Sequence, residues 1–364
     1  MEGKSEDRIA RRTDRPAPAL EQTDSVTHGR TGRTKAIALL SGGLDSTLAI
    51  SMMLEQGINV LALNFTSPFC TCSPRKAGGC HLASTVAERL GVEIRVLHKG
   101  MEYLRVVERP RFGRGRGLNP CIDCRIFILR KAALLMEEVG ASFVVTGEVL
   151  GQRPMSQHRA ALETIERESG LVGRLLRPLS AHLLEETIPE REGLVRRDLL
   201  LSLHGRAREV QLDQVRRRGV EVFGCPSGGC LLTDPLIARR LQDVFERCPN
   251  WDLRDAKLTT WGRHFRLHER LKVILGRDEE ENARLVHLAG ELPRVEFVSD
   301  PGPSAVLRGP YDEHDLITVG RLLRFYAKKA TAPTVELRLR DGDRETLWGA
   351  QDRAAAEEVA RWTL

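Results

Sequence analysis

Long apolar runs are missing from this chain, and their absence excludes one class of protein. A helix that crosses a membrane needs about 18 consecutive apolar residues, and no such run occurs anywhere in the 364 residues. Residues 1–34 also lack the apolar segment of a secretory signal, so we expect a disordered N-terminal extension there. The sequence therefore predicts a cytoplasmic protein without membrane contact.

A strong excess of one charge is also missing. The 56 basic and 50 acidic residues leave a net charge of +6, which alone gives no reason to expect nucleic acid. Apolar residues make up 41% of the chain and charged residues 29%, a balance typical of globular proteins with a sizeable core. The length allows about two or three domains.

Two common phosphate-binding motifs are absent, but a third pattern stands in their place. The chain has neither the lysine-bearing Walker A loop nor a G-x-G-x-x-G fingerprint where an apolar strand meets a helix. Instead, the residues SGGLDS at 41–46 follow the apolar segment 36–40 and precede the helical segment 47–54. A buried strand, a tight glycine turn and a helix are therefore expected in succession.

The residue types of this turn suit a bound phosphate group. Gly42 and Gly43 let the backbone come close to a ligand and direct its amides inward. Ser46 is expected to start the helix, where free N–H groups and the helix dipole attract an anion. The Asp45 carboxylate could hold Mg²⁺ beside that phosphate, next to the Ser41 hydroxyl.

Apolar segments alternate with helical ones through the first half of the chain. The expected strands are 36–40, 59–65, 92–97, 142–146 and 175–179. Such alternation predicts an α/β fold, with a parallel sheet and helices on both faces. Because ligands bind such sheets at the carboxyl ends of the strands, the turn at 41–46 and Gly147-Glu148 are expected at the same edge.

The chain is expected to divide into three parts after the N-terminal extension. Residues 35–185 form the α/β domain, 186–249 a helical, basic extension that carries Cys225 and Cys230, and 250–364 a small α+β domain that is a candidate for RNA binding. Within the last part, 334–340 alternates apolar and polar residues and predicts a half-exposed strand. The segment 299–303, rich in proline and glycine, is expected to be a linker.

An arginine-rich segment lies between the expected strand at 92–97 and the expected helix at 125–139. Its arginines are Arg105, Arg109, Arg111, Arg114 and Arg116. Three glycines are interspersed with them, so a flexible basic loop suited to a phosphate backbone is expected.

The eight cysteines are clustered, which favours metal binding or redox chemistry over a disulfide framework. Cys121 and Cys124 lie directly before an expected helix, whose N-terminus favours the reactive thiolate. Three interpretations are open: a catalytic thiol pair with a distant partner, a zinc site completed by Cys225 and Cys230, or an iron–sulfur cluster with one open iron.

Several of these segments together resemble a known family. The turn at 41–46 resembles the signature of the PP-loop ATP pyrophosphatases. Cys124-Arg125, 145–152, Ser156-Gln157 and 176–179 are similar to the PP-loop domain of tRNA 4-thiouridine synthetases. Two further segments, Asn119-Pro120 before the cysteines and Gly228-Gly229-Cys230, are similar to the catalytic cysteine regions of tRNA 2-thiouridylases. The resemblance covers about residues 35–235; the N-terminal RNA-binding region and the rhodanese-like extension of some relatives are not recognised.

This resemblance implies a fold and a reaction. The fold is the adenine nucleotide α-hydrolase-like PP-loop fold, and the reaction is ATP-dependent thiolation of uridine in tRNA. Such enzymes adenylate a base carbonyl oxygen, so that it leaves as AMP, and replace it with sulfur. The residues assigned to ATP and Mg²⁺ by this resemblance are Ser41, Gly42, Gly43, Asp45, Ser46, Gly147, Gln152, Ser156 and Gln157.

The same resemblance assigns the catalytic and sulfur-handling residues. Asp45, Cys124 and Cys230 are the expected catalytic residues. In the iron–sulfur subgroup the ligands of a [4Fe–4S] cluster map to Cys121, Cys124 and Cys230, whereas persulfide relatives would use only the last two. The additional Cys121 favours the cluster. The expected sulfur donor is sulfide or a cysteine desulfurase, and tRNA phosphates would contact Arg109, Arg111, Arg114 and Arg116.

Two other functions remain open. A PP-loop ligase or amidase would use an amine of a non-tRNA acceptor, and the paired thiols count against it. A non-enzymatic RNA-binding metalloprotein would not need the intact turn at 41–46. Separately, Cys70, Cys72 and Cys80 could hold a structural zinc ion or be free loop thiols.

Overall fold

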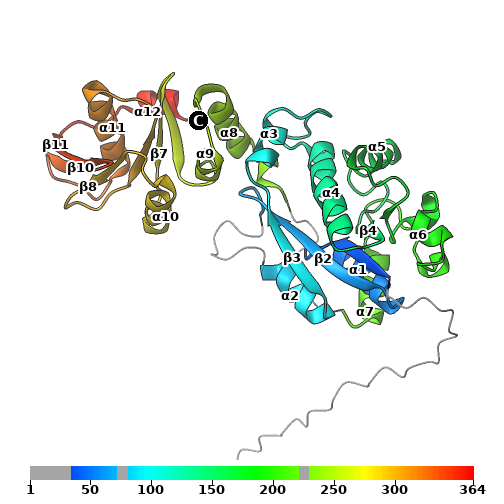
Figure 1. Ribbon diagram of the computed structural model, residues 1–364. Coiled ribbons are helices and arrows are strands. Elements are labelled where there is room, and N and C mark those ends of the chain that lie inside the picture. Colours follow the sequence, from blue (N-terminus) through cyan, green and yellow to red (C-terminus); the bar gives the residue numbers. More distant parts are fainter. Residues whose placement is uncertain (1–33, 72–80, 221–228) are drawn as a thin grey trace, which may run out of the picture. The chain divides into compact units, whose positions relative to one another are not determined.

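The computed structural model describes residues 34–71, 81–220 and 229–364. These ranges form two β-sheets, one of five strands and one of six, each accompanied by helices (Figure 1). Within the same ranges, no helix combines the length and the apolar character needed to cross a membrane.

The first sheet is parallel and has the strand order β3-β2-β1-β4-β5. Its strands are β1 (Lys35–Leu39), β2 (Asn59–Thr66), β3 (Glu93–His98), β4 (Phe143–Val145) and β5 (Leu175–Leu176). The expected parallel sheet is confirmed, and each of these strands overlaps an apolar segment identified in the sequence. The main difference is β5, which is shorter than its apolar segment.

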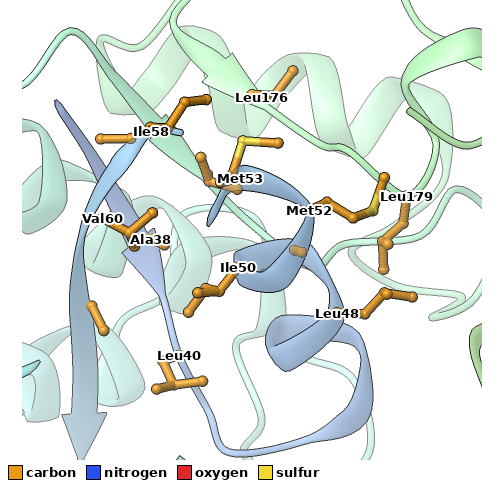
Figure 2. Packing of buried hydrophobic residues seen from close by; sticks show 14 of the residues in the cluster. Ala38, Leu40, Leu48, Ile50, Met52, Met53, Ile58, Val60, Leu176 and Leu179 are labelled. Carbon is orange, nitrogen blue, oxygen red and sulfur yellow. The ribbon is translucent and has the colours of Figure 1, made fainter. Parts of the chain in front are cut away.

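Helices cover both faces of this sheet, as the sequence predicts. They are α1 (Leu44–Glu55), α2 (His81–Leu90), α3 (Met101–Glu108), α4 (Cys121–Glu138), α5 (Arg159–Ser169), α6 (Ile188–Arg191) and α7 (Glu209–Arg217). Successive strand residues point to opposite faces, so Ala38 joins one core with side chains of α1, α2 and α7. Its neighbours Ile37 and Leu39 join a second core with side chains of α4. Figure 2 shows the first core, in which Ile50 and Met53 of α1 lie among strand side chains.

The strand order creates a switch point between β1 and β4. From β1 the chain proceeds to β2 and β3 on one side, and later enters β4 and β5 on the other. The carboxyl ends of β1 and β4 are therefore neighbours, with the loops that follow them diverging. Ligands of such sheets bind in this crevice.

The second sheet is antiparallel, with the order β11-β10-β8-β9-β7-β6. Its strands are β6 (Arg263–His268), β7 (Leu271–Leu275), β8 (Arg294–Phe297), β9 (Ala305–Arg308), β10 (Val335–Asp341) and β11 (Arg344–Ala350). Its helices are α10 (Glu279–Ala289), α11 (Glu313–Tyr326) and α12 (Ala356–Trp362). The half-exposed strand predicted at 334–340 is β10. The linker expected at 299–303 lies inside this sheet, where it connects β8 to its own neighbour β9.

Two helices precede the second sheet, namely α8 (Pro235–Arg247) and α9 (Leu253–Leu258). On α8 the buried Asp243 carboxylate accepts hydrogen bonds from Arg266 Nη2 on β6 (2.6 Å) and Lys272 Nζ on β7 (2.9 Å). A buried charge without a partner is costly, so this triad fixes α8 to the second sheet.

Candidate functional site at the edge of the parallel sheet

The glycine turn between β1 and α1 is held by its own side chains. The Ser41 and Ser46 hydroxyl oxygens are 3.1 Å apart, and Ser46 Oγ also donates to the Gly43 carbonyl oxygen (3.0 Å). Gly42 has a φ of 77°, and a Cβ there would lie 2.9 Å from a side chain of α2, so glycine is required on both counts. Helix α1 begins at Leu44, two residues before the expected start.

Asp45 has one hydrogen-bonded and one unpartnered carboxylate oxygen. Gln152 Nε2 donates to its Oδ2 at 3.1 Å. Its Oδ1 is buried and accepts no hydrogen bond from the described residues. Burial raises the pKa of Asp45, opposed by the Gln152 hydrogen bond and the charges of Arg208 and Arg153. A buried carboxylate oxygen with a free lone pair fits a hard cation such as Mg²⁺.

The loop after β4 packs directly against this turn. A Cβ on Gly147 would lie 2.5 Å from the Asp45 carbonyl carbon and oxygen, so only glycine allows this approach. The same loop carries Gln152, Ser156 and Gln157, all buried. The structure thus brings Gly147 and Gln152 against Asp45 of the glycine turn, whereas the nucleotide-binding roles expected for Ser156 and Gln157 stay predictions.

Three residues that the sequence did not assign to the site also face Asp45. The guanidinium groups of Arg153 and Arg208 act electrostatically on its carboxylate. Gln211 on α7 approaches the same carboxylate, is 1% exposed, and has no amide hydrogen bond of ordinary geometry to the described residues. They were missed because they come from two later segments without a motif. Cationic and amide donors beside a carboxylate suit a polyphosphate with its metal ion.

The paired thiols form the first turn of α4. Burial raises the pKa of Cys121, as does Cys124, whereas the charges of Arg153 and Arg125 oppose the rise. Because Arg153 interacts with both Cys121 and Asp45, the start of α4 lies next to the nucleotide turn.

The second thiol, Cys124, faces the ends of β2 and β3. Lys99 Nζ donates a hydrogen bond to Cys124 Sγ at 3.4 Å and lies 4.6 Å from the centroid of the Tyr103 ring. Burial raises the pKa of Tyr103 well above its ordinary value, and neighbouring Cys124, Cys230 and Cys70 raise it further. Three thiols therefore lie within electrostatic range of the Tyr103 hydroxyl group.

Cys230 reaches this place from far along the chain. It forms an isolated antiparallel bridge with Cys70, which lies in the turn after β2. Burial raises the pKa of Cys230 to about 11, with further contributions from Cys124 and Cys70 and opposition from Lys99. The structure thus brings Cys124 and Cys230 together, with Cys121 on the nucleotide side of Cys124 and the unexpected Cys70 on the other.

The metal assignments receive no support from this arrangement. Among the described residues, no three His, Cys, Asp or Glu side chains are grouped closely enough to hold a metal ion. The [4Fe–4S] ligand set of Cys121, Cys124 and Cys230 therefore stays a prediction. Of the zinc ligands considered, Cys72, Cys80 and Cys225 lie outside the described residues.

A buried ion-pair network lies beside α4, which is called the thiol helix here because it carries Cys121 and Cys124. The Glu148 side chain is 1% exposed and pairs with Arg125 Nε (3.3 Å) and Arg177 Nε (3.2 Å). Arg177 also donates to Glu166 on α5 at 2.7 Å. Glu148 therefore orients Arg125, which faces Cys121, and both of its oxygens lie beside guanidinium groups.

From Arg109 onward the arginine-rich segment is a loop anchored by the thiol helix, whereas Arg105, which was expected in the same loop, lies on α3. The Asp123 carboxylate of α4 accepts hydrogen bonds from the backbone N–H groups of Arg111 (2.9 Å) and Phe112 (3.0 Å). The Arg111 guanidinium pairs with Glu168 (2.7 Å), and Arg114 donates to the Glu108 carbonyl oxygen (2.7 Å).

Two arginines of this loop are left free. Arg109 and Arg116 are exposed. Their side chains make no ion pair or hydrogen bond within the described ranges. Their charges are thus available to a partner, on a loop fixed to the helix that carries Cys121 and Cys124.

Two family matches cover most of the described chain. Residues 31–188 match the family "Thiamine biosynthesis protein (ThiI)", and residues 262–363 match the family "NFACT protein RNA binding domain". The first match contains the glycine turn, the thiol helix and the loop after β4. The second coincides with the six-stranded sheet and its helices.

Curated relatives resemble the first part of the chain. A probable tRNA sulfurtransferase from Methanothermobacter thermautotrophicus is 32% identical over 119 residues, which are 32% of this chain and 30% of that protein. The tRNA-specific 2-thiouridylase MnmA from Symbiobacterium thermophilum is 29% identical over 140 residues, 34% of this chain and 36% of that protein. A probable tRNA sulfurtransferase from Staphylococcus aureus is 29% identical over 157 residues, 42% of this chain and 36% of that protein. The chain thus spans only about a third of the length of these relatives.

Among solved structures, a 4-thiouridine synthetase in complex with RNA and bound ATP is 23% identical, covering 57% of this chain and 50% of that one, with a TM-score of 0.33. A superposition this partial adds nothing to the fold described above. The sequence matches carry the assignment: this chain has a PP-loop domain of the ThiI type at residues 31–188, followed by a domain of the NFACT RNA-binding type at residues 262–363.

Proposed function

We propose that this protein is an ATP-dependent tRNA sulfurtransferase that adenylates a uridine carbonyl oxygen and replaces it with sulfur. The position of Arg153 supports this most directly, because its charge acts both on Asp45 in the glycine turn and on Cys121 at the start of α4. A nucleotide-binding turn and a group of thiols then share one edge of the sheet. A reaction that first activates a base and then thiolates it needs this proximity.

The glycine turn would bind the phosphates of ATP. Backbone amides at the start of α1 and the helix dipole attract the departing pyrophosphate. Asp45 Oδ1 would ligate Mg²⁺, which neutralises charge on the phosphates when bound. Arg153 and Arg208 face the same carboxylate and would stabilise the charge that develops on the leaving group.

The thiols would deliver the sulfur. A persulfide on Cys230 would attack the adenylated carbon with its terminal sulfur, and AMP would leave with the original oxygen. The Lys99 ammonium group, hydrogen-bonded to Cys124 Sγ, can stabilise negative charge that develops on the neighbouring sulfur atoms. The approach of Cys124 and Cys70 to Cys230 supports the persulfide route, and a [4Fe–4S] cluster on Cys121, Cys124 and Cys230 is the alternative.

The acceptor would be a base of tRNA. The relatives named tRNA sulfurtransferase and the match of 262–363 to an RNA-binding domain support this assignment. Arg109 and Arg116 would grip phosphates beside the target base, which must be unstacked to reach the thiols.

The experiment that tests this function separates its two half-reactions. We expect the wild-type chain to release pyrophosphate from ATP only in the presence of tRNA, and AMP only when a sulfur source is present as well. The variant Cys230→Ser keeps the nucleotide turn, so it should still release pyrophosphate on adenylation but form no thiolated nucleoside. Absence of tRNA-dependent pyrophosphate release by the wild type would overturn the proposal.

A further inference from the structure

Cys70 and Cys230 face each other across a short pair of extended segments. The two residues form an isolated antiparallel bridge, and the neighbouring Leu231 N–H donates to the Phe69 carbonyl oxygen at 2.8 Å. Thr71 Oγ1 donates to the Gly229 carbonyl oxygen (3.0 Å) on the other side of the bridge. The flanking residues therefore carry the hydrogen bonds, and the cysteines occupy a non-hydrogen-bonded position.

That position has a chemical consequence. Residues in a non-hydrogen-bonded antiparallel pair have Cα atoms about 4.5 Å apart, with side chains close together on the same face. Disulfides need Cα separations of about 4.4–6.8 Å. Both cysteines are free thiols and partly exposed, so the backbone already holds them within bonding range.

The pair also belongs to the proposed thiol site. Cys70, Cys124 and Cys230 all act on the Tyr103 hydroxyl. Ser67 Oγ lies 3.4 Å from Cys70 Sγ, so a hydroxyl group is in place to exchange a proton with this sulfur. Cys124 lies on α4 and accepts a hydrogen bond from Lys99, which follows β3, whereas the position of Cys70 relative to Cys230 is fixed by backbone pairing.

We propose that Cys70 is the resolving thiol of sulfur transfer, which closes a disulfide with Cys230 at the end of each turnover. The inference rests on the proposed function and goes beyond it, because neither family resemblance assigns a role to Cys70. It also gives Cys70 a covalent role in place of the two alternatives left open by the sequence, a structural zinc ligand and a free loop thiol.

The chemistry balances without an additional oxidant. The terminal sulfur of a Cys230 persulfide forms a bond to the activated carbon as the carbon–oxygen bond to AMP breaks, which leaves a disulfide between the base sulfur and Cys230. The Cys70 thiolate then attacks Cys230 Sγ and the base leaves as its thiolate, which takes up the proton. The sulfane sulfur is reduced by two electrons and the two thiols are oxidised to a disulfide. A dithiol reductant must restore them by exchange.

Disulfide mapping tests the pairing itself. The reduced full chain is treated with oxidised glutathione, its remaining thiols are alkylated, and tryptic peptides are analysed by mass spectrometry. Fragment ions assign each bond, because Cys72 shares a peptide with Cys70 and Cys225 shares one with Cys230. We expect a Cys70–Cys230 bond, which also forms in the variant Cys124→Ser. A bond of Cys230 to Cys124 alone, with Cys70 fully alkylated, would overturn the proposal.

A turnover experiment tests the role. With tRNA, ATP, a persulfide donor and thioredoxin with its reductase in place of a small-molecule thiol, Cys70→Ser should release AMP in a first turnover like the wild type. Its steady-state yield of thiolated nucleoside should fall about tenfold or more, since the base stays attached to Cys230. The matched control is Cys248→Ala, a buried cysteine in the core near Arg266. Equal steady-state yields for Cys70→Ser and the control would contradict the role.

Disulfide mapping and the turnover experiment together distinguish a failure of this inference from a failure of the proposed function. If the wild type forms no thiolated nucleoside, the proposed function fails, and the resolving role fails with it even where the disulfide is mapped. If the wild type thiolates tRNA and Cys70→Ser does so equally well, only the inference about Cys70 fails. In that case Cys124 is the resolving thiol.

Discussion

At the scale of single residues, Asp45 shows a conflict between stability and function. Its carboxylate is buried, which raises its pKa, and its Oδ1 atom lacks a hydrogen bond from the described residues. Carrying a charge there at neutral pH costs free energy unless a cation or a ligand compensates. Gln152 offsets only part of this cost, so we interpret the remainder as the consequence of a binding site.

The variant Asp45→Asn should therefore be more stable than the wild type but inactive. Asparagine keeps an acceptor for Gln152 Nε2 and removes the buried charge. Because the folded-state pKa is raised above the ordinary value of 3.8, the wild type loses stability relative to the variant as pH rises through the folded-state pKa. We expect a higher melting temperature at pH 7 without Mg²⁺, no difference below the ordinary carboxyl pKa, and pyrophosphate release reduced at least about a hundredfold.

Thermal unfolding across the pH range and a pyrophosphate assay check both parts. A variant that is less stable than the wild type at neutral pH would contradict the interpretation that the buried charge of Asp45 lowers the stability of the unliganded protein. Full activity of the variant would remove Asp45 from the nucleotide site.

Cys230 is predicted to react slowly with alkylating agents at neutral pH. Burial and the neighbouring thiols Cys124 and Cys70 raise its pKa from 9.0 to about 11, so little thiolate is present at pH 8. Two pKa units correspond to about a hundredfold less thiolate than an unperturbed thiol would have at that pH. The rate of iodoacetamide labelling, followed by mass spectrometry of the Cys230 peptide, should keep rising with pH up to about 11. A rate that levels off below pH 9 would show a thiol poised as a thiolate instead.

At the scale of elements, two neighbouring strand ends define the site. The turn after β1 and the loop after β4 touch where Gly147 meets the Asp45 backbone. The strand order makes this contact possible, because β1 and β4 are neighbours in the parallel sheet. The thiols arrive at the same edge on α4 and on the segments after β2 and before α8.

The variant Gly147→Ala should separate these two elements without unfolding the sheet. A Cβ at this position would lie 2.5 Å from the Asp45 carbonyl, so the loop after β4 must move away and take Gln152 with it. Displacement of reacting groups by about 1 Å commonly costs about a hundredfold in rate. We expect that loss in pyrophosphate release, together with weaker ATP binding measured by calorimetry.

Gly100→Ala provides the control for this change. A Cβ on Gly100 meets no atom within 4 Å, and its backbone angle is open to alanine, so ATP binding should be retained. If Gly147→Ala binds ATP as tightly as this control, the contact between the two elements is unimportant.

Much of the first sheet was readable from the sequence because its physical signals are local. The strands are short apolar runs between turns, and the glycine turn and the loop after β4 follow two of them directly. The switch of strand order placed Gly147 beside Asp45, as the predicted parallel sheet required.

Other parts of the site were not readable because their signals are not local. The bridge between Cys70 and Cys230 pairs two loop segments, so no alternation of apolar and polar residues predicts it. Arg153 and Arg208 lie outside any motif, and their roles emerge only from their approach to Asp45.

At the scale of the whole molecule, the net charge is only +6, but positive charge is concentrated in the arginine-rich segment. The loop with Arg109 and Arg116 is anchored to the thiol helix by Asp123, and a segment matched to an RNA-binding family follows at 262–363. Two separate RNA contacts on one chain would let binding and base positioning be divided between them. The domain limits at 185/186 and 249/250 stay predictions.

The double variant Arg109→Ala/Arg116→Ala should weaken tRNA binding and reduce its dependence on salt. Each phosphate contact contributes about one unit to the slope of log K against log salt concentration, so the slope should fall by up to about two. Arg196→Ala is the control, because this exposed arginine is already paired with Asp198 (2.8 Å). Fluorescence anisotropy at several salt concentrations measures both slopes; equal slopes would remove the loop from the RNA interface.

The most direct test of the central proposal is the product itself. The purified protein is incubated with an unmodified tRNA transcript, ATP, Mg²⁺ and a sulfur source, and the tRNA is digested to nucleosides for mass spectrometry. We predict a uridine with one oxygen exchanged for sulfur, formed only with ATP present and absent with Asp45→Asn. An unmodified transcript after tRNA-dependent release of AMP, or a new nucleoside that contains nitrogen in place of sulfur, would contradict it.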